Sequence, residues 1–138
     1  MIAPDVALQT AIESAVTADA ELMTQIAWIY DEVPDDPYAG KTAYLSFGPS
    51  DLRDQSAECV QTEVHNLQID VWSKAVGRIE AKGLTRRVID LIRGGSLIMP
   101  AHRLGETVLA LHRIISDPDP GVTHGVVQFD FHIEVEEG

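Results

Sequence analysis

Residues 63–95 constrain the fold most, because they predict one long strand, a short turn and one long helix in immediate succession. Apolar and polar side chains alternate over residues 64–73, which is typical of a strand with one buried face. The expected buried positions are Leu67, Ile69 and Val71, and the opposite face carries Asn66, Gln68, Asp70 and Trp72. This half of the segment therefore predicts a strand that packs one face against a core.

The second half of the segment changes to a repeat of three and four residues, the pattern of an amphipathic helix. Its apolar positions are Ala81, Leu84, Val88, Leu91 and Ile92, and its polar surface carries Arg78, Lys82, Arg86 and Arg87. Gly94 and Gly95 follow, as expected where a helix ends. Gly83, inside the helix, costs about 1 kcal/mol relative to alanine, so we expect either a close contact there or compensation by packing elsewhere.

The remaining elements predict an α+β fold. We expect helix at 5–17, a short helical turn at 20–25, an extended segment at 26–30, and strands at 42–47, 103–116 and 124–137. The strand at 103–116 is apolar on both faces and is predicted to be central, while Phe129, Phe131 and Ile133 are predicted core residues. With 138 residues the chain forms a single domain, 1–138, in which a largely antiparallel sheet of about four strands packs against two helices.

Two features are candidates for partner contact. Residues 48–62 are polar and are predicted to form a long connection between two strands, and long connections are commonly functional. We predict that this connection contacts a partner through Asp51, Arg53, Asp54 and Glu58. Trp72 either fills a second core layer under a helix or serves as an anchor between subunits.

The charge balance limits the classes of partner. The chain has 22 acidic and 10 basic residues, a formal net charge of -12, which disfavours binding to nucleic acid through phosphate contacts. An acidic surface repels DNA and therefore suits a wall past which DNA slides. No apolar run approaches the roughly 20 residues that span a bilayer, and no secretory pattern is present, so we expect synthesis in the cytoplasm and no membrane partner.

No residue pattern indicates a catalytic, cofactor or metal site. The single cysteine, Cys59, has an acidic neighbour, and none of the five histidines has a recognised metal-ligating spacing. The one enzymatic alternative is a cross-strand pair of His112 and His132, with Asp130 beside it. We therefore predict a protein that is not an enzyme and that needs no cofactor.

Several segments in order resemble a known family. The runs are an N-terminal helix followed by IYDEVP, the segment HNLQIDVWSKAVGRIEAK, then HRL and a strand, and finally DPDPGVTHGVVQFDFHIE. Nearly the whole chain is similar to the tail-terminator or tail-completion proteins of long-tailed bacteriophages and gene transfer agents. The most specific parts are residues 71–82 and 117–129.

The resemblance implies a structural virion protein at the tail and neck junction. Relatives form a closed ring of six subunits that caps the head-proximal end of the tail tube and ends its polymerisation. The ring joins the tail to head-completion or stopper proteins while DNA passes through its centre. The family has no catalytic residues to carry over. An alternative of another class is a tail-tube-like or head-joining structural protein, and a small histidine-dependent enzyme is a weaker one.

Overall fold

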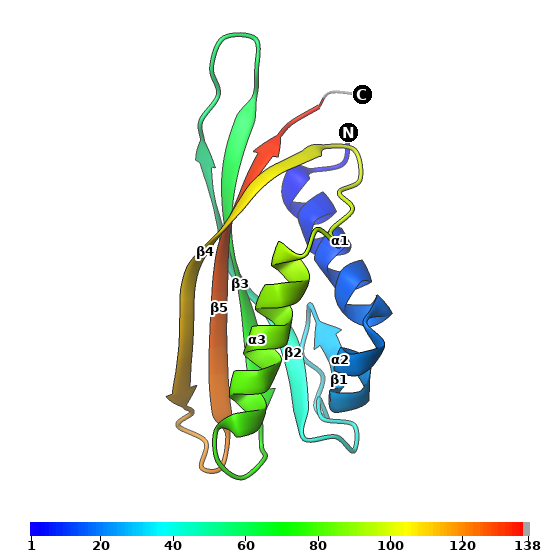
Figure 1. Cartoon of the computed structure of the whole chain (residues 1–138), viewed down its shortest axis with the longest axis vertical. Helices are drawn as coiled ribbons and strands as arrows, with labels where there is room; N and C mark the ends of the chain where they lie inside the picture. The colour runs from blue at the N-terminus through cyan, green and yellow to red at the C-terminus, as the bar shows by residue number, and fades with distance from the viewer. Residues whose placement is uncertain (137–138) are drawn as a thin grey trace.

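The computed structural model describes residues 1–136 and shows two layers, with helices covering one face of a sheet (Figure 1). In this part of the chain the elements are α1 (Pro4–Ala18), α2 (Ala20–Gln25), β1 (Ile26–Tyr30), β2 (Ala43–Asp54), β3 (Thr62–Ser73), α3 (Ile79–Arg93), β4 (Arg103–Ser116) and β5 (Thr123–Glu134). The strand order is β1-β2-β3-β5-β4. The predicted end of the last strand, Glu137, lies outside the described residues.

The sheet is antiparallel except at one edge, where β1 pairs parallel to β2. The α+β class and the largely antiparallel sheet are confirmed, with five strands and three helices in residues 1–136 against the expected four and two. The additional strand is β1, which was predicted only as an extended segment. Its strand character depends on pairing with β2, and a sequence does not reveal which distant segment supplies that partner.

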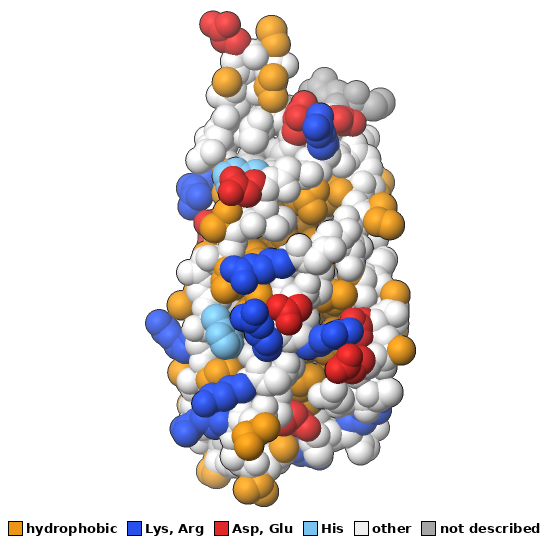
Figure 2. Space-filling model, viewed as in Figure 1, with side chains coloured by type: hydrophobic (Ala, Val, Ile, Leu, Met, Phe, Trp, Pro, Cys, Tyr) orange, Lys and Arg blue, Asp and Glu red, His pale blue; other side chains and the backbone are white. Residues whose placement is uncertain are grey.

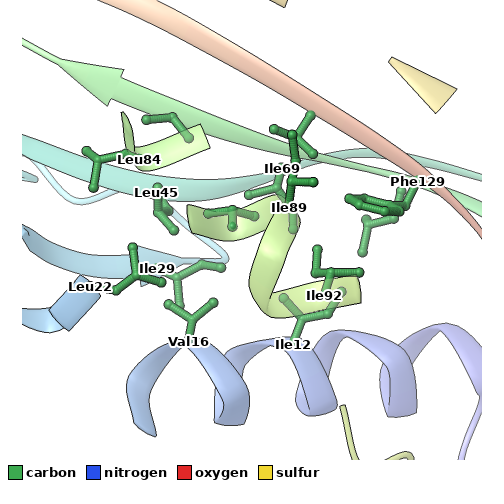
Figure 3. Packing of buried hydrophobic residues seen from close by; sticks show 14 of the residues in the cluster. Ile12, Val16, Leu22, Ile29, Leu45, Ile69, Leu84, Ile89, Ile92 and Phe129 are labelled. Atoms are coloured by element: carbon green, nitrogen blue, oxygen red, sulfur yellow. The ribbon is translucent and has the colours of Figure 1, made fainter. Parts of the chain in front are cut away.

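The core lies between the helices and the sheet. Side chains from α1, α2, α3 and four strands point toward one another in this layer (Figure 3). The predicted core positions of β5 are confirmed, because Phe129, Phe131 and Ile133 are at most 1% exposed. α3 packs across β3, β5 and β4, while α1 packs against α3 and β1.

Close packing of α3 on the sheet depends on one glycine of β5. A Cβ atom at Gly125 would lie only 2.5 Å from Thr85 Cγ2 on α3 and 3.2 Å from Val71 Cβ. The absence of a side chain at this position therefore lets α3 approach the sheet. A Cβ atom added at Gly83, by contrast, would have no neighbouring atom within 4 Å, so packing elsewhere offsets the cost of this glycine.

The predicted long connection at 48–62 is wrong in extent. β2 continues through Asp54 and β3 begins at Thr62, so residues 55–61 alone join them. The pairing register shifts between Phe47 and Ser50, which breaks the alternation that would have marked β2 as one strand. Residues 51–61, which we call the hairpin arm, are all exposed and extend beyond the rest of the sheet (Figure 1).

The predicted central position of residues 103–116 is also wrong, since β4 is an outermost strand. Its pairing with β5 shifts register between Leu104 and Thr107 and again between Leu109 and Leu111. An extra residue reverses which face the following side chains occupy. Leu109, before the second shift, pairs with the core residue Phe129, and Ile114, after it, lies beside Gly125. Odd-numbered apolar residues before the shift and even-numbered ones after it therefore lie on the same face of the sheet.

Candidate assembly surfaces

The sheet face turned away from the helices, which we call the open face, carries a connected set of polar side chains. Asn66 Nδ2 donates to Asp130 Oδ1 at 3.0 Å, and Gln128 Nε2 donates to Gln68 Oε1 at 2.9 Å. Gln68 Nε2 in turn donates to Asp70 Oδ1 at 2.8 Å. The first two bonds cross between β3 and β5, because the register places each pair of residues opposite one another. The result is an ordered polar surface rather than a solvated row of independent side chains.

An aromatic cluster continues the open face toward β1. The Trp72 ring stacks on His124 with centroids 3.9 Å apart and planes 9° apart, and Trp72 Nε1 donates to Ser46 Oγ at 2.9 Å. Tyr44 lies on the other side of Trp72, with ring centroids 6.2 Å apart. Burial is the main cause that raises the pKa of Tyr44 above its ordinary value, so this phenol stays neutral.

Trp72 therefore lies between two rings on the open face, and it is half-buried. The interpretation that it sits under a helix is wrong, because the helices in residues 1–136 pack on the opposite face (Figure 1). Its role as an anchor between subunits stays a prediction.

The hairpin arm presents all four predicted contact residues to solvent: Asp51, Arg53, Asp54 and Glu58. Asp54 Oδ1 accepts two hydrogen bonds from Ser56, one from its side-chain hydroxyl at 2.6 Å and one from its backbone N–H at 2.9 Å. These bonds lower the pKa of Asp54. At the tip, Ala57 and Val60 exchange two backbone hydrogen bonds of 3.0 Å. The arm is thus an ordered two-stranded projection with acidic and basic side chains along it.

The two histidines of the enzymatic alternative do not meet. His112 pairs with the core residue Val127, and its Nε2 lies 2.9 Å from Thr85 Oγ1 on α3. His132 follows the core residue Phe131 on β5 and so points to the other face. Within residues 1–136, no three His, Cys, Asp or Glu side chains are grouped so that they could hold a metal ion.

His102 has a structural role that the sequence did not indicate. Its Nδ1 accepts the backbone N–H of Glu136 at 3.0 Å, so its Nε2 carries the proton and donates to the carbonyl of Ile2 at 2.6 Å. This buried ring connects both ends of the described chain to the start of β4.

A groove of about 350 Å³ lies between α1 and the base of the hairpin arm. Asp5, Glu13 and Asp31 contribute carboxylates to its lining, and Gln9 Nε2 donates to Asp31 Oδ1 at 2.9 Å. The groove is open and acidic, which suits a basic side chain more than an anion.

Sequence reasoning missed the aromatic cluster and the acidic groove. Tyr44, Trp72 and His124 come from three strands, and they meet only because of the cross-strand register. Alternation within a single strand does not reveal that register. The described helices include none with the length and apolar character needed to cross a membrane.

Comparison with known proteins gives a consistent result. Residues 10–134 match the family described as Tail completion protein gp17. A chain in the virion of a native gene transfer agent particle is 28% identical, with a TM-score of 0.85 over 97% of this chain and 99% of that chain. The bacteriophage SPP1 gp17 protein shares the fold, with 20% identity and a TM-score of 0.60 over 96% of this chain and 93% of that chain. Comparison with curated protein sequences gives no match.

Proposed function

Because this chain belongs to the Tail completion protein gp17 family, a family of structural virion tail proteins, we propose that it forms a closed ring capping the head-proximal end of a tail tube. The ring, most simply of six copies, ends tube polymerisation and joins the tail to a head-completion or stopper protein. The observation that carries this proposal is the near full-length similarity to a chain of a gene transfer agent virion.

The charge of the chain supports a passage for DNA through the ring. A net charge of -12 gives each copy a surface that repels phosphate groups at short range. DNA that moves past such a surface is not retained by it. We propose that DNA is cargo and not a bound partner.

The hairpin arm supports contact with the tail tube or with an adjacent subunit. It projects beyond the sheet, and Leu52 and Val60 on it are 52% and 43% exposed. Apolar groups flanked by Asp51, Arg53, Asp54 and Glu58 fit the usual composition of an interface with a polar rim. Trp72, on the open face, is proposed as an anchor residue for a second contact.

A labelling experiment tests the position in the particle. Particles from the source would be decorated with an antibody fragment against this chain and imaged by electron microscopy. We expect label at the junction of head and tail, arranged as a closed ring. Label along the whole tail would instead indicate a tube subunit, and absence of label from particles would contradict a virion role.

A variant of the arm tests its contact. Alanine replacement of Asp51, Arg53, Asp54 and Glu58 should leave the chain folded and reduce the fraction of particles with joined tails. The matched control replaces Asp117 and Asp119, at the opposite end of the sheet, by alanine. Normal tail length and full infectivity or gene transfer for the arm variant would contradict the proposed contact.

A further inference from the structure

The charges of this chain are distributed unevenly along its sequence. Residues 1–40 contain eight Asp or Glu and no Lys or Arg, a net charge of -8. Residues 78–116 contain seven Lys or Arg and three Asp or Glu, a net charge of +4. The second segment is thus basic within a chain whose total charge is -12.

The fold places the edge strands of these two segments, β1 and β4, on opposite sides of the sheet, while α3 lies across β3, β5 and β4 and also contacts α1. Residues 1–40 form α1, α2, β1 and the connector after β1, whereas residues 78–116 include α3 and β4. β1 and β4 are the two outermost strands; in Figure 1 β1 lies on the right and the later part of β4 on the left, while the start of β4 crosses toward the N-terminus. Figure 2 shows Lys and Arg side chains gathered over α3 and the adjoining part of β4. We call these the acidic edge and the basic edge.

Most of these charges face solvent. On the basic edge Arg78, Lys82, Arg86, Arg93 and Arg113 are exposed. Two of the arginines also form ion pairs within the same chain: Arg87 binds Asp19 at 2.8 Å and Glu21 at 3.3 Å, and the exposed Arg86 binds Asp90 at 3.2 Å. On the acidic edge the exposed carboxylates of the connector belong to Asp31, Glu32, Asp35 and Asp36.

Each edge also exposes large apolar side chains. Ile79 and Ile115 lie at the basic edge, with exposed fractions of 86% and 40%, and Val76, in the loop just before it, is 104% exposed. Trp28 and Val33 lie at the acidic edge, exposed by 41% and 44%. Apolar groups surrounded by charges are typical of surfaces that another protein covers. Each edge strand additionally has backbone groups without a strand partner on its outer side.

We propose that the basic edge of one copy docks against the acidic edge of the next copy. This inference rests on the proposed ring and specifies its subunit contact. A contact between two different surfaces of identical chains is head-to-tail, and head-to-tail contacts close into rings when the rotation allows.

Electrostatics favours this pairing over the alternatives. Two copies that each carry -12 repel at long range, so a contact in which opposite charges meet locally is favoured over one between like charges. Within the described chain the segment from 78 to 116 is the one basic region large enough to meet the acidic edge. The acidic groove beside α1, lined by Asp5, Glu13 and Asp31, offers a recess for an arginine side chain of the neighbour.

Charge reversal tests the proposal. One variant carries Lys82→Glu and Arg113→Glu on the basic edge, and a second carries Asp35→Lys and Asp36→Lys on the acidic edge. A third variant combines all four changes and keeps the net charge of -12. Association between copies is measured by sedimentation velocity, and assembly is measured as the fraction of tail-joined particles after complementation in cells.

We expect each two-residue variant to weaken association, or the yield of joined particles, by about tenfold or more. The four-residue variant should restore assembly, because each reversed edge again meets its opposite charge. A one-to-one mixture of the two two-residue variants should also assemble with the two kinds of copy alternating, because each edge of one variant then meets the opposite charge on the other. The four-residue variant controls for the number of reversed charges, because it carries all four changes at the original net charge of -12, and unfolding midpoints check that every variant folds.

Several outcomes would overturn the edge pairing. One is that both two-residue variants assemble as well as the wild type while antibody label still shows a ring. That result would rule out the edge pairing but would leave the proposed function standing. Another is a four-residue variant that remains defective. If the basic-edge variant alone is defective and also loses retention on DNA, the basic edge serves DNA instead of a second copy. Absence of any ring at the head and tail junction would count against the proposed function itself.

Discussion

At the scale of single residues, Asp19 is the connection between α2 and α3. Its side chain accepts the backbone N–H of Leu22 at 3.0 Å, as an N-cap, and binds Arg87 at 2.8 Å. Burial alone would raise the pKa of Asp19, but the hydrogen bonds from Leu22 and Arg87 outweigh it and hold the pKa below its ordinary value of 3.8.

We expect Asp19→Ala to lower the free energy of unfolding by about 1 to 2 kcal/mol, mainly through loss of the cap. Asp19→Asn keeps a capping side chain and should cost less. Because the folded pKa is lowered, the stabilisation by the carboxylate is complete above its unfolded pKa and is lost as pH falls through the folded pKa. Denaturant unfolding of the wild type and Asp19→Asn should therefore converge in acid; a constant difference at all pH values would contradict this.

Gly83 offers a stabilising substitution in α3. It lies inside the helix, is exposed, and has no atom within 4 Å of the position of an added Cβ. We expect Gly83→Ala to raise the free energy of unfolding by about 0.5 to 1 kcal/mol. Gly125→Ala is the matched control, because the added Cβ would meet Thr85 at 2.5 Å and should destabilise the chain. Equal effects of the two changes on the thermal midpoint would be inconsistent with this packing.

At the scale of elements, the hairpin arm should be thermodynamically separate from the core. Every residue from 51 to 61 is exposed. Replacing residues 56–60 by the turn dipeptide Asn-Gly should change the free energy of unfolding by no more than about 0.5 kcal/mol. Phe131→Ala, at a fully buried position, should cost about 3 to 5 kcal/mol by the same measurement. A large loss of stability from shortening the arm would show that it supports the fold.

At the scale of the whole molecule, net charge should affect stability. A chain with a charge of -12 repels itself when compact, and salt screens this repulsion. We expect the thermal midpoint of the dilute chain to rise between about 0.02 M and about 0.5 M NaCl. Asp35→Asn with Asp36→Asn reduces the net charge to -10 and should reduce the rise. A midpoint that falls with salt would indicate that attractive ion pairs dominate instead.

Local patterns in the amino-acid sequence were enough to predict most of the regular elements, although not β1 as a strand or the second half of β2. α3 and β5 follow directly from their periods of hydrophobic residues, since each buries one face of a regular element. The family also followed from residues 71–82 and 117–129 in their order along the chain, and it is confirmed.

Which segments became neighbours depended on tertiary structure. Strand pairing placed β4 at an edge, and two register shifts made both of its faces look apolar in the sequence. The strand register also joined Tyr44, Trp72 and His124, and it separated His112 from His132 across the sheet. The acidic and basic segments lie at opposite edges because strand order depends on long-range pairing, which no local pattern encodes.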